Sequence, residues 1–118
     1  MFVKRCYSLK RNKEFRHVYR AGKSVGSRIL VLLYVKSRNP NLKIGFSVSK
    51  KLGNAVHRNR IKRRLREAVT PLLPELQAGY KLIFIAREAI ADESFNRICS
   101  TMRYLVHKAN LLIDTTVK

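Results

Sequence analysis

The hydrophobic positions near the start of the chain predict a short helix. Phe15, Val18 and Tyr19 are spaced i, i+3 and i+4, which places them on one side of a helix that we expect over about residues 11–21. Gly22 follows this segment. We expect it to end the helix in the left-handed conformation that is common just past a helix C-terminus.

Two apolar runs follow and predict strands. Residues 28–36 are rich in Ile, Leu, Val and Tyr on both faces, which is typical of a strand inside a sheet and covered on both sides. Residues 42–49 alternate instead, with one apolar face and one small, polar, accessible face that carries Lys43, Gly45, Ser47 and Ser49. The turn signal at 38–41 predicts an antiparallel hairpin between the two strands. A further short strand is possible at 24–27.

The second half of the chain predicts two helices around one strand. A helix over about 55–70 has an apolar stripe of Ile61, Leu65, Ala68 and Leu72, with Asn59, Arg60, Arg63 and Arg66 roughly opposite it. Pro71 and Pro74 end or kink this helix. Residues 80–86 form a strand, and Asp92 is the expected N-cap of a last helix over about 93–111.

The predicted order of elements is α-β-β-(β)-α-β-α. This order indicates an α+β fold, a two-layer α/β sandwich in which helices pack on a small sheet. At 118 residues the chain has the length of a single domain.

Charge is distributed very unevenly along the chain. The first 66 residues contain 20 Lys and Arg and one acid, Glu14, whereas the last 52 contain six basic and six acidic residues. The formal net charge of +19 therefore belongs to the N-terminal part. Such a one-signed field repels itself unless a polyanion binds it, which indicates a nucleic acid as partner.

The residues that could carry chemistry do not form a catalytic pattern. The seven acids form no metal-binding group, because the adjacent Asp92 and Glu93 are explained by a helix N-terminus. The histidines and the two cysteines, Cys6 and Cys99, lack metal-ligand spacing. His57 is either a phosphate contact or a solvated side chain. We therefore expect no self-contained active site and no metal site on the protein.

The sequence has no signal for a membrane or for secretion. Its longest apolar run, residues 29–35, is far shorter than the ~20 residues that span a bilayer. The first residues lack the apolar region of a signal peptide. We expect a cytoplasmic protein without a membrane partner.

Phe15 and Tyr19 allow two interpretations. They either pack in the core or form a stacking wall for an unpaired nucleic-acid strand. The small residues Gly45 and Ser47 would let a nucleic-acid backbone approach the sheet closely. Both interpretations hold together if Phe15 lies at the edge of a groove between helix and sheet.

Residues 47–68 resemble the signature of the bacterial ribonuclease P protein component. The pattern Lys-Lys-x-Gly-Asn-Ala-Val-x-Arg-Asn-Arg-x-Lys-Arg begins at Lys50, and the resemblance extends over about residues 8–112. It implies a mixed sheet with a left-handed βαβ crossover, a fold also found in a ribosomal protein domain. The general rule favours right-handed crossovers, so periodicity alone could not have shown this.

The resemblance also implies the activity. Ribonuclease P removes the 5′ leader of precursor tRNA; its RNA subunit holds Mg²⁺ and performs the hydrolysis, while the protein subunit binds that RNA and the leader. No cofactor is expected on the protein, and the free protein is expected to be a monomer or a weak dimer. Residues 1–8 would be a basic flexible arm, 9–112 the domain and 113–118 a tail. The alternative is a small basic ribosomal or other structural RNA-binding protein.

Two sets of residues carry the family's contacts. The resemblance assigns binding of the RNA subunit to Lys50, Lys51, Asn54, Arg58, Asn59, Arg60, Lys62, Arg63 and Arg66. It assigns the leader-binding cleft to Arg11, Phe15, Tyr19, Val31, Leu33 and Ser47. Some members carry an aromatic residue where Leu33 aligns, and here the aromatic is its neighbour Tyr34. Adjacent strand residues point to opposite faces, so either the register shifts by one or the cleft wall is aliphatic.

Overall fold

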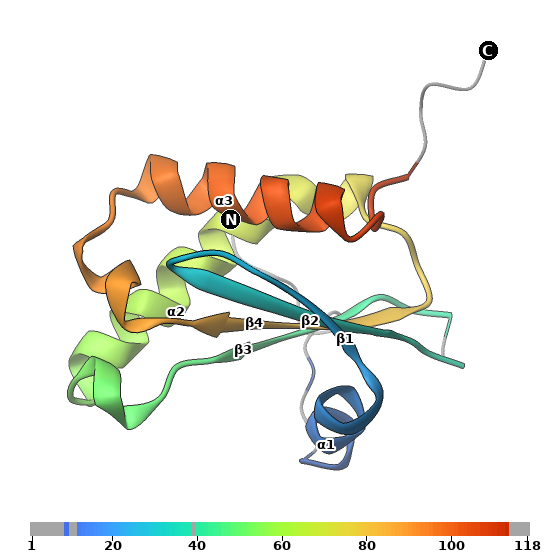
Figure 1. Cartoon of the computed structure of the whole chain (residues 1–118), viewed down its shortest axis with the longest axis horizontal. Coiled ribbons are helices and arrows are strands. Elements are labelled where there is room, and N and C mark those ends of the chain that lie inside the picture. The colour runs from blue at the N-terminus through green and yellow to red at the C-terminus, as the bar shows by residue number, and fades with distance from the viewer. Residues whose placement is uncertain (1–8, 10–11, 39, 114–118) are drawn as a thin grey trace.

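A computed structural model describes residues 9, 12–38 and 40–113 of the chain. The predicted order of elements is confirmed, including the short extra strand (Figure 1). In chain order the elements are α1 (Asn12–Ala21), β1 (Lys23–Gly26), β2 (Leu30–Lys36), β3 (Lys43–Ser47), α2 (Ala55–Val69), β4 (Tyr80–Ala86) and α3 (Phe95–Lys108). The predicted arm at 1–8, Arg11 and the last residues of the predicted tail lie outside the described residues.

The four strands form one mixed sheet in the order β1-β2-β4-β3. β2 pairs antiparallel with both β1 and β4, and β3 pairs parallel with β4. The predicted hairpin between β2 and β3 is therefore wrong, because β4 lies between them. Alternating polarity shows which face of β3 is buried but not which strand is its neighbour. The α2 connection from β3 to the parallel strand β4 is the βαβ crossover of the expected α+β sandwich.

One face of the sheet is covered by α2 and α3, which lie side by side above it (Figure 1). Leu30 and Leu32 of β2 are completely buried there, together with Leu65 of α2 and Met102 of α3. Phe84 of β4 is also fully buried and stacks on Phe46 of β3, with ring centroids 6.1 Å apart. This continuous cluster is the main hydrophobic core.

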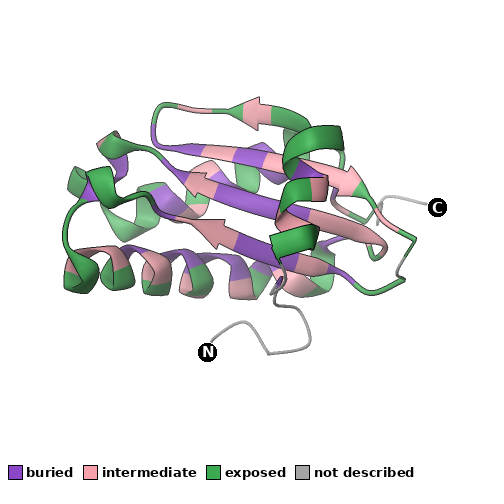
Figure 2. Cartoon of the chain, turned by 90° about the horizontal axis from the view of Figure 1, so that it is seen from below, coloured by how far each residue is buried: buried purple, intermediate pink, exposed green. Residues whose placement is uncertain are grey.

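The opposite face is covered only in part, by α1. Val18 and Leu9 are buried against Ile83 of β4, and Phe15, Leu33, Val35 and Ile85 pack around them half-buried. Figure 2 shows α1 lying across the strands toward one end of the sheet, so that the other end of this face has no helix over it. The two-layer prediction holds for α2 and α3, while α1 adds a partial third layer.

The helix ends differ from the prediction in two places. Gly22 does not have a positive φ; its amide donates to the Val18 carbonyl at 2.8 Å, and a Cβ there would collide with that oxygen. Glycine is thus needed for close approach rather than for a left-handed turn. Asp92 does not cap α3, because residues Glu88–Asp92 form a 3-10 turn and Ser94 accepts a hydrogen bond from the Arg97 amide at 3.2 Å.

Other helix ends follow from local chemistry. α2 ends at Val69, where a 3-10 segment containing Pro71 and Pro74 takes over, as the prolines predicted. α3 ends before the predicted residue 111, since Asn110 adopts a left-handed φ of 60°. No helix among the described residues has the length and apolar character needed to cross a membrane.

Candidate nucleic-acid interface

The cationic face of α2 is present as predicted. Ile61, Leu65 and Ala68 are buried in the core, and the residues on the other side of the helix, Asn59, Arg60, Arg63 and Arg66, are exposed. Arg63 forms an ion pair with Glu67 one turn later at 3.6 Å. The helix thus presents a row of guanidinium groups to solvent while its other side anchors it to the sheet.

The segment that leads into α2 extends this surface. Lys50 and Lys51 are exposed on a 3-10 turn, which ends at Gly53 with φ 128°. The Asn54 side chain caps α2 by accepting the His57 amide at 2.9 Å, and Arg58 Nε donates to the Gly53 carbonyl at 3.2 Å. Asn54 and Arg58 therefore shape the turn, in addition to any contact with RNA.

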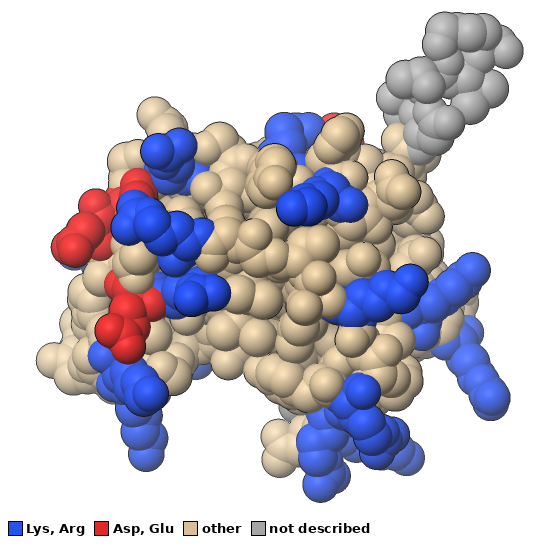
Figure 3. All heavy atoms as spheres, viewed as in Figure 1, with Lys and Arg blue, Asp and Glu red and all other residues tan. Residues whose placement is uncertain are grey.

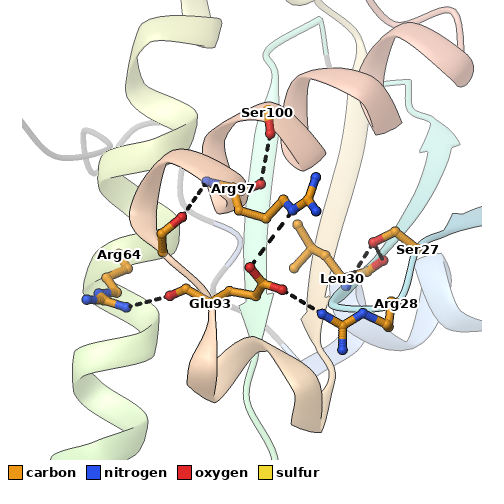
Figure 4. A network of polar contacts seen from close by, with 8 residues as sticks. Ser27, Arg28, Leu30, Arg64, Glu93, Arg97 and Ser100 are labelled. Carbon is orange, nitrogen blue, oxygen red and sulfur yellow. Dashed lines mark hydrogen bonds and ion pairs between the residues drawn. The ribbon is translucent and has the colours of Figure 1, made fainter.

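A junction at Glu93 links α2, α3 and the start of β2, and no periodic pattern in the sequence predicts it. The Glu93 carboxylate lies 2.6 Å from Arg28, which precedes β2, and 3.9 Å from Arg97 of α3 (Figure 4). Its backbone carbonyl accepts a hydrogen bond from Arg64 of α2 at 3.3 Å. Arg64 is thus turned toward α3. A segment between β4 and α3 thereby ties together the helical layer and the start of β2.

Two of the six predicted cleft residues, Val31 and Ser47, lie at the open end of the sheet, the end of the α1 face that no helix covers. Val31, Ile85 and Ser47 lie in one row across β2, β4 and β3, and all three are half-exposed. Tyr19 of α1 is 50% exposed beside this face, one turn beyond Phe15. The structure therefore brings together Val31, Ser47 and the aromatic side of α1.

Phe15 fills the space over Gly45, so this part of the expected accessible face is covered. A Cβ on Gly45 would lie 2.7 Å from the Phe15 ring, which means that only glycine allows the ring to lie so close to β3. Gly45 is buried, whereas Ser47 and Ser49 on the same face are accessible. The core-packing interpretation of Phe15 is confirmed, since the ring packs in the smaller core, and its stacking role stays a prediction.

Leu33 and Tyr34 lie on opposite faces of the sheet. Leu33 belongs to the cluster under α1, and Tyr34 packs against the main core under the helices. The residue on the α1 face at this position is therefore aliphatic, and a leader-binding role for Leu33 stays a prediction. Arg11, the remaining predicted cleft residue, lies outside the described residues.

In the part of the chain that the structure describes, the acidic, histidine and cysteine side chains are spread over the surface. Among residues 9, 12–38 and 40–113, no three His, Cys, Asp or Glu side chains are placed to hold a metal ion. Cys99 is a free, half-buried thiol, and burial raises its pKa. The site offers cationic and apolar surfaces rather than acid–base groups.

The fold and these surfaces define a small basic α/β nucleic-acid-binding protein. The family model for ribonuclease P matches residues 3–110. A ribonuclease P protein component from Clostridium botulinum (strain Langeland / NCTC 10281 / Type F) is 45% identical over 104 residues, which cover 87% of this chain and 94% of that protein. The chain belongs to the ribonuclease P protein family, whose members are subunits of a tRNA-processing endoribonuclease.

Solved structures agree with this assignment. The RNase P protein of Staphylococcus aureus superposes with a TM-score of 0.83 at 33% identity, covering 91% of this chain and 98% of that one. A mutant of the S. aureus protein, described as defective in mRNA degradation activity, also has a TM-score of 0.83, at 35% identity, and covers 89% of each chain. The roles predicted for individual residues stay predictions.

Proposed function

We propose that this subunit binds two RNAs on two different surfaces. The cationic face of α2, with Lys50 and Lys51, binds the backbone of the catalytic RNA subunit. The open end of the sheet, bordered by Phe15 and Tyr19, holds the unpaired 5′ leader of precursor tRNA. The observation that carries the proposal is the difference between the surfaces: rows of guanidinium groups suit phosphates, and an exposed ring beside an aliphatic floor suits unpaired bases.

Catalysis is proposed to reside in the RNA subunit, which would hold the Mg²⁺ ions. Several carboxylates of the protein are committed to ion pairs, namely Glu67 with Arg63, Glu75 with Arg103 and Glu93 with Arg28. These side chains neutralise arginines instead of facing the open end of the sheet. The protein would act in the cytoplasm, as a monomer or weak dimer before assembly, by reducing repulsion between the ribozyme and its substrate.

Reconstitution tests this division of labour. The protein freed of all RNA is expected to leave precursor tRNA intact, and to restore cleavage by a ribonuclease P RNA at low Mg²⁺. Cleavage of precursor tRNA by the RNA-free protein would contradict the accessory role. An unstructured mRNA fragment belongs in the same assay, because mRNA degradation is named for the S. aureus protein; we expect it to stay intact.

Tyr19 offers a clean test of the leader surface. Tyr19→Ala is expected to weaken binding of precursor tRNA to the reconstituted enzyme by ~1–3 kcal/mol, the contribution of one stacked base, while binding of mature tRNA stays unchanged. Tyr104→Ala is the matched control, since Tyr104 is 53% exposed, against 50% for Tyr19, and lies on α3 on the other layer. Equal losses for precursor and mature tRNA would remove Tyr19 from the leader path.

A further inference from the structure

The two sides of α1 differ in chemistry. Phe15 and Tyr19 lie toward the open end of the sheet, and basic side chains occupy the opposite side. There, a hollow of roughly 730 Å³ separates α1 from the loop after β2, and it is lined by Lys13, Arg16, His17, Arg20, Arg38 and Lys81, with Glu14 as the one carboxylate of the lining. Figure 3 shows Lys and Arg side chains gathered over α1 and at the adjacent end of the sheet. Neither of the two proposed RNA surfaces includes these residues.

The positive charges around this hollow repel one another. Lys13, Arg16 and Arg20 are spaced i, i+3 and i+7 on one side of α1, where like charges destabilise a helix. Lys81 Nζ of β4 donates a hydrogen bond to His17 Nδ1 at 3.5 Å, which brings a further positive charge to this side of α1. An anion in the hollow would relieve repulsion contributed by three separate elements.

We propose that this hollow is a third RNA contact, which binds the phosphate backbone of a base-paired RNA segment. Its lining has five Lys and Arg side chains and no Phe, Tyr or Trp, and its one ring, the His17 imidazole, lies 3.5 Å from Lys81 Nζ, so the hollow suits phosphates better than unpaired bases. In a duplex the bases face inward and the phosphates outward, which matches this lining. The inference rests on the proposed RNA-binding function, and α1 separates this contact from the leader.

Two charge-matched pairs of variants test the proposal. Arg20 and Arg38 line the hollow and are exposed, so Arg20→Gln with Arg38→Gln removes two charges without disturbing the core. Lys36→Gln with Lys108→Gln removes two exposed charges outside the hollow. Affinity is measured from 50 to 400 mM salt for the RNA subunit alone, and for mature and precursor tRNA on the reconstituted enzyme. Arg60→Ala is measured alongside as a variant of the α2 surface.

We expect the hollow pair to lower the slope of log affinity against log salt by ~1.4–1.8, about 0.7–0.9 for each lost phosphate contact. A loss with the RNA subunit, or with mature tRNA, supports the proposal and identifies the source of the duplex. An equal loss for the control pair, a loss confined to the leader, or no loss overturns it. If Arg60→Ala also leaves every slope unchanged, the proposed function itself fails.

Discussion

The two faces of the sheet differ in how completely helices cover them. Under α2 and α3, residues such as Leu30, Leu32 and Phe84 have no exposed surface, and both helices contribute to one continuous core. On the α1 face, Val31 and Ile85 of the same strands stay half-exposed. Burial of apolar area is the main source of stability, so the helical face holds the fold together and the α1 face can leave part of the sheet available for a ligand.

The largest predicted effect tests this division of roles directly. Phe84→Ala is expected to lower the free energy of unfolding by ~3–5 kcal/mol, because it leaves a cavity in the main core. Val31→Ala, on the adjacent strand but on the α1 face, is expected to cost about 1 kcal/mol or less. Urea denaturation measures both.

If Phe84→Ala does not fold, Phe84→Leu supplies the comparison, with an expected loss of about 1 kcal/mol. If Phe84→Leu and Val31→Leu lowered the free energy of unfolding by equal amounts relative to the parent, both faces would stabilise the domain alike. That result would contradict the predicted difference between the two faces.

A second prediction concerns the contact between α1 and the sheet. Gly45→Ala would place a methyl group 2.7 Å from the Phe15 ring, so we expect a loss of ~1–3 kcal/mol in unfolding free energy and weaker precursor binding as the ring moves. Gly26→Ala is the matched control, because its Cβ would meet only Val31 Cγ2 at 3.6 Å. Its effect should stay within ~0.5 kcal/mol. A harmless Gly45→Ala would mean that α1 shifts freely on the sheet.

The amphipathic pattern of α2 shows which structural properties local sequence determines. Its apolar stripe and its cationic face follow from spacing alone, and both are confirmed. The strand order could not be predicted in this way, because alternation in β3 assigns a face and leaves the neighbouring strand open. Gly45 shows the same limit. Its small size predicted close approach of a nucleic-acid backbone, but the fold brings Phe15, 30 residues earlier in the chain, over it.

The site was predictable where it rests on one element and not where it joins several. The predicted cationic residues of α2 lie on one helix, so the helical repeat alone predicts that they are exposed on the same side. The sequence pattern explains Glu93 as part of a helix N-terminus. Its partners lie on separate elements, because Arg28 precedes β2 and Arg97 belongs to α3. The hollow beside α1 likewise combines α1, β4 and the loop after β2. Such contacts depend on tertiary structure, which a periodic pattern does not contain.

A third prediction concerns the strength of the ion pair between Arg28 and Glu93, which links the helical layer to the start of β2. A double-mutant cycle with Arg28→Ala and Glu93→Ala is expected to give a coupling of ~0.5–1 kcal/mol, because the Arg28 side chain is 73% exposed and solvent screens the pair. The unfolding free energies of the four proteins give this value. A coupling above about 2 kcal/mol would make the junction, rather than the core, a major support of this face.

The smallest predicted effect lies on the outer surface of the helical layer. Arg103 of α3 donates two hydrogen bonds to the Glu75 carboxylate, at 3.0 and 3.1 Å, and these lower the pKa of Glu75 below its ordinary value. A carboxylate with a lowered pKa stabilises the fold above its unfolded-state pKa, and this contribution is lost as pH falls through the folded-state pKa. Arg103→Ala should therefore be slightly less stable than the parent at pH 7, and the difference should shrink as pH falls below the ordinary Glu pKa and disappear below the lowered folded-state pKa. Thermal unfolding from pH 7 to 3 measures it. A difference that grows on acidification would have the wrong sign, and would show that Arg103 contributes through packing on α3 instead of through this ion pair.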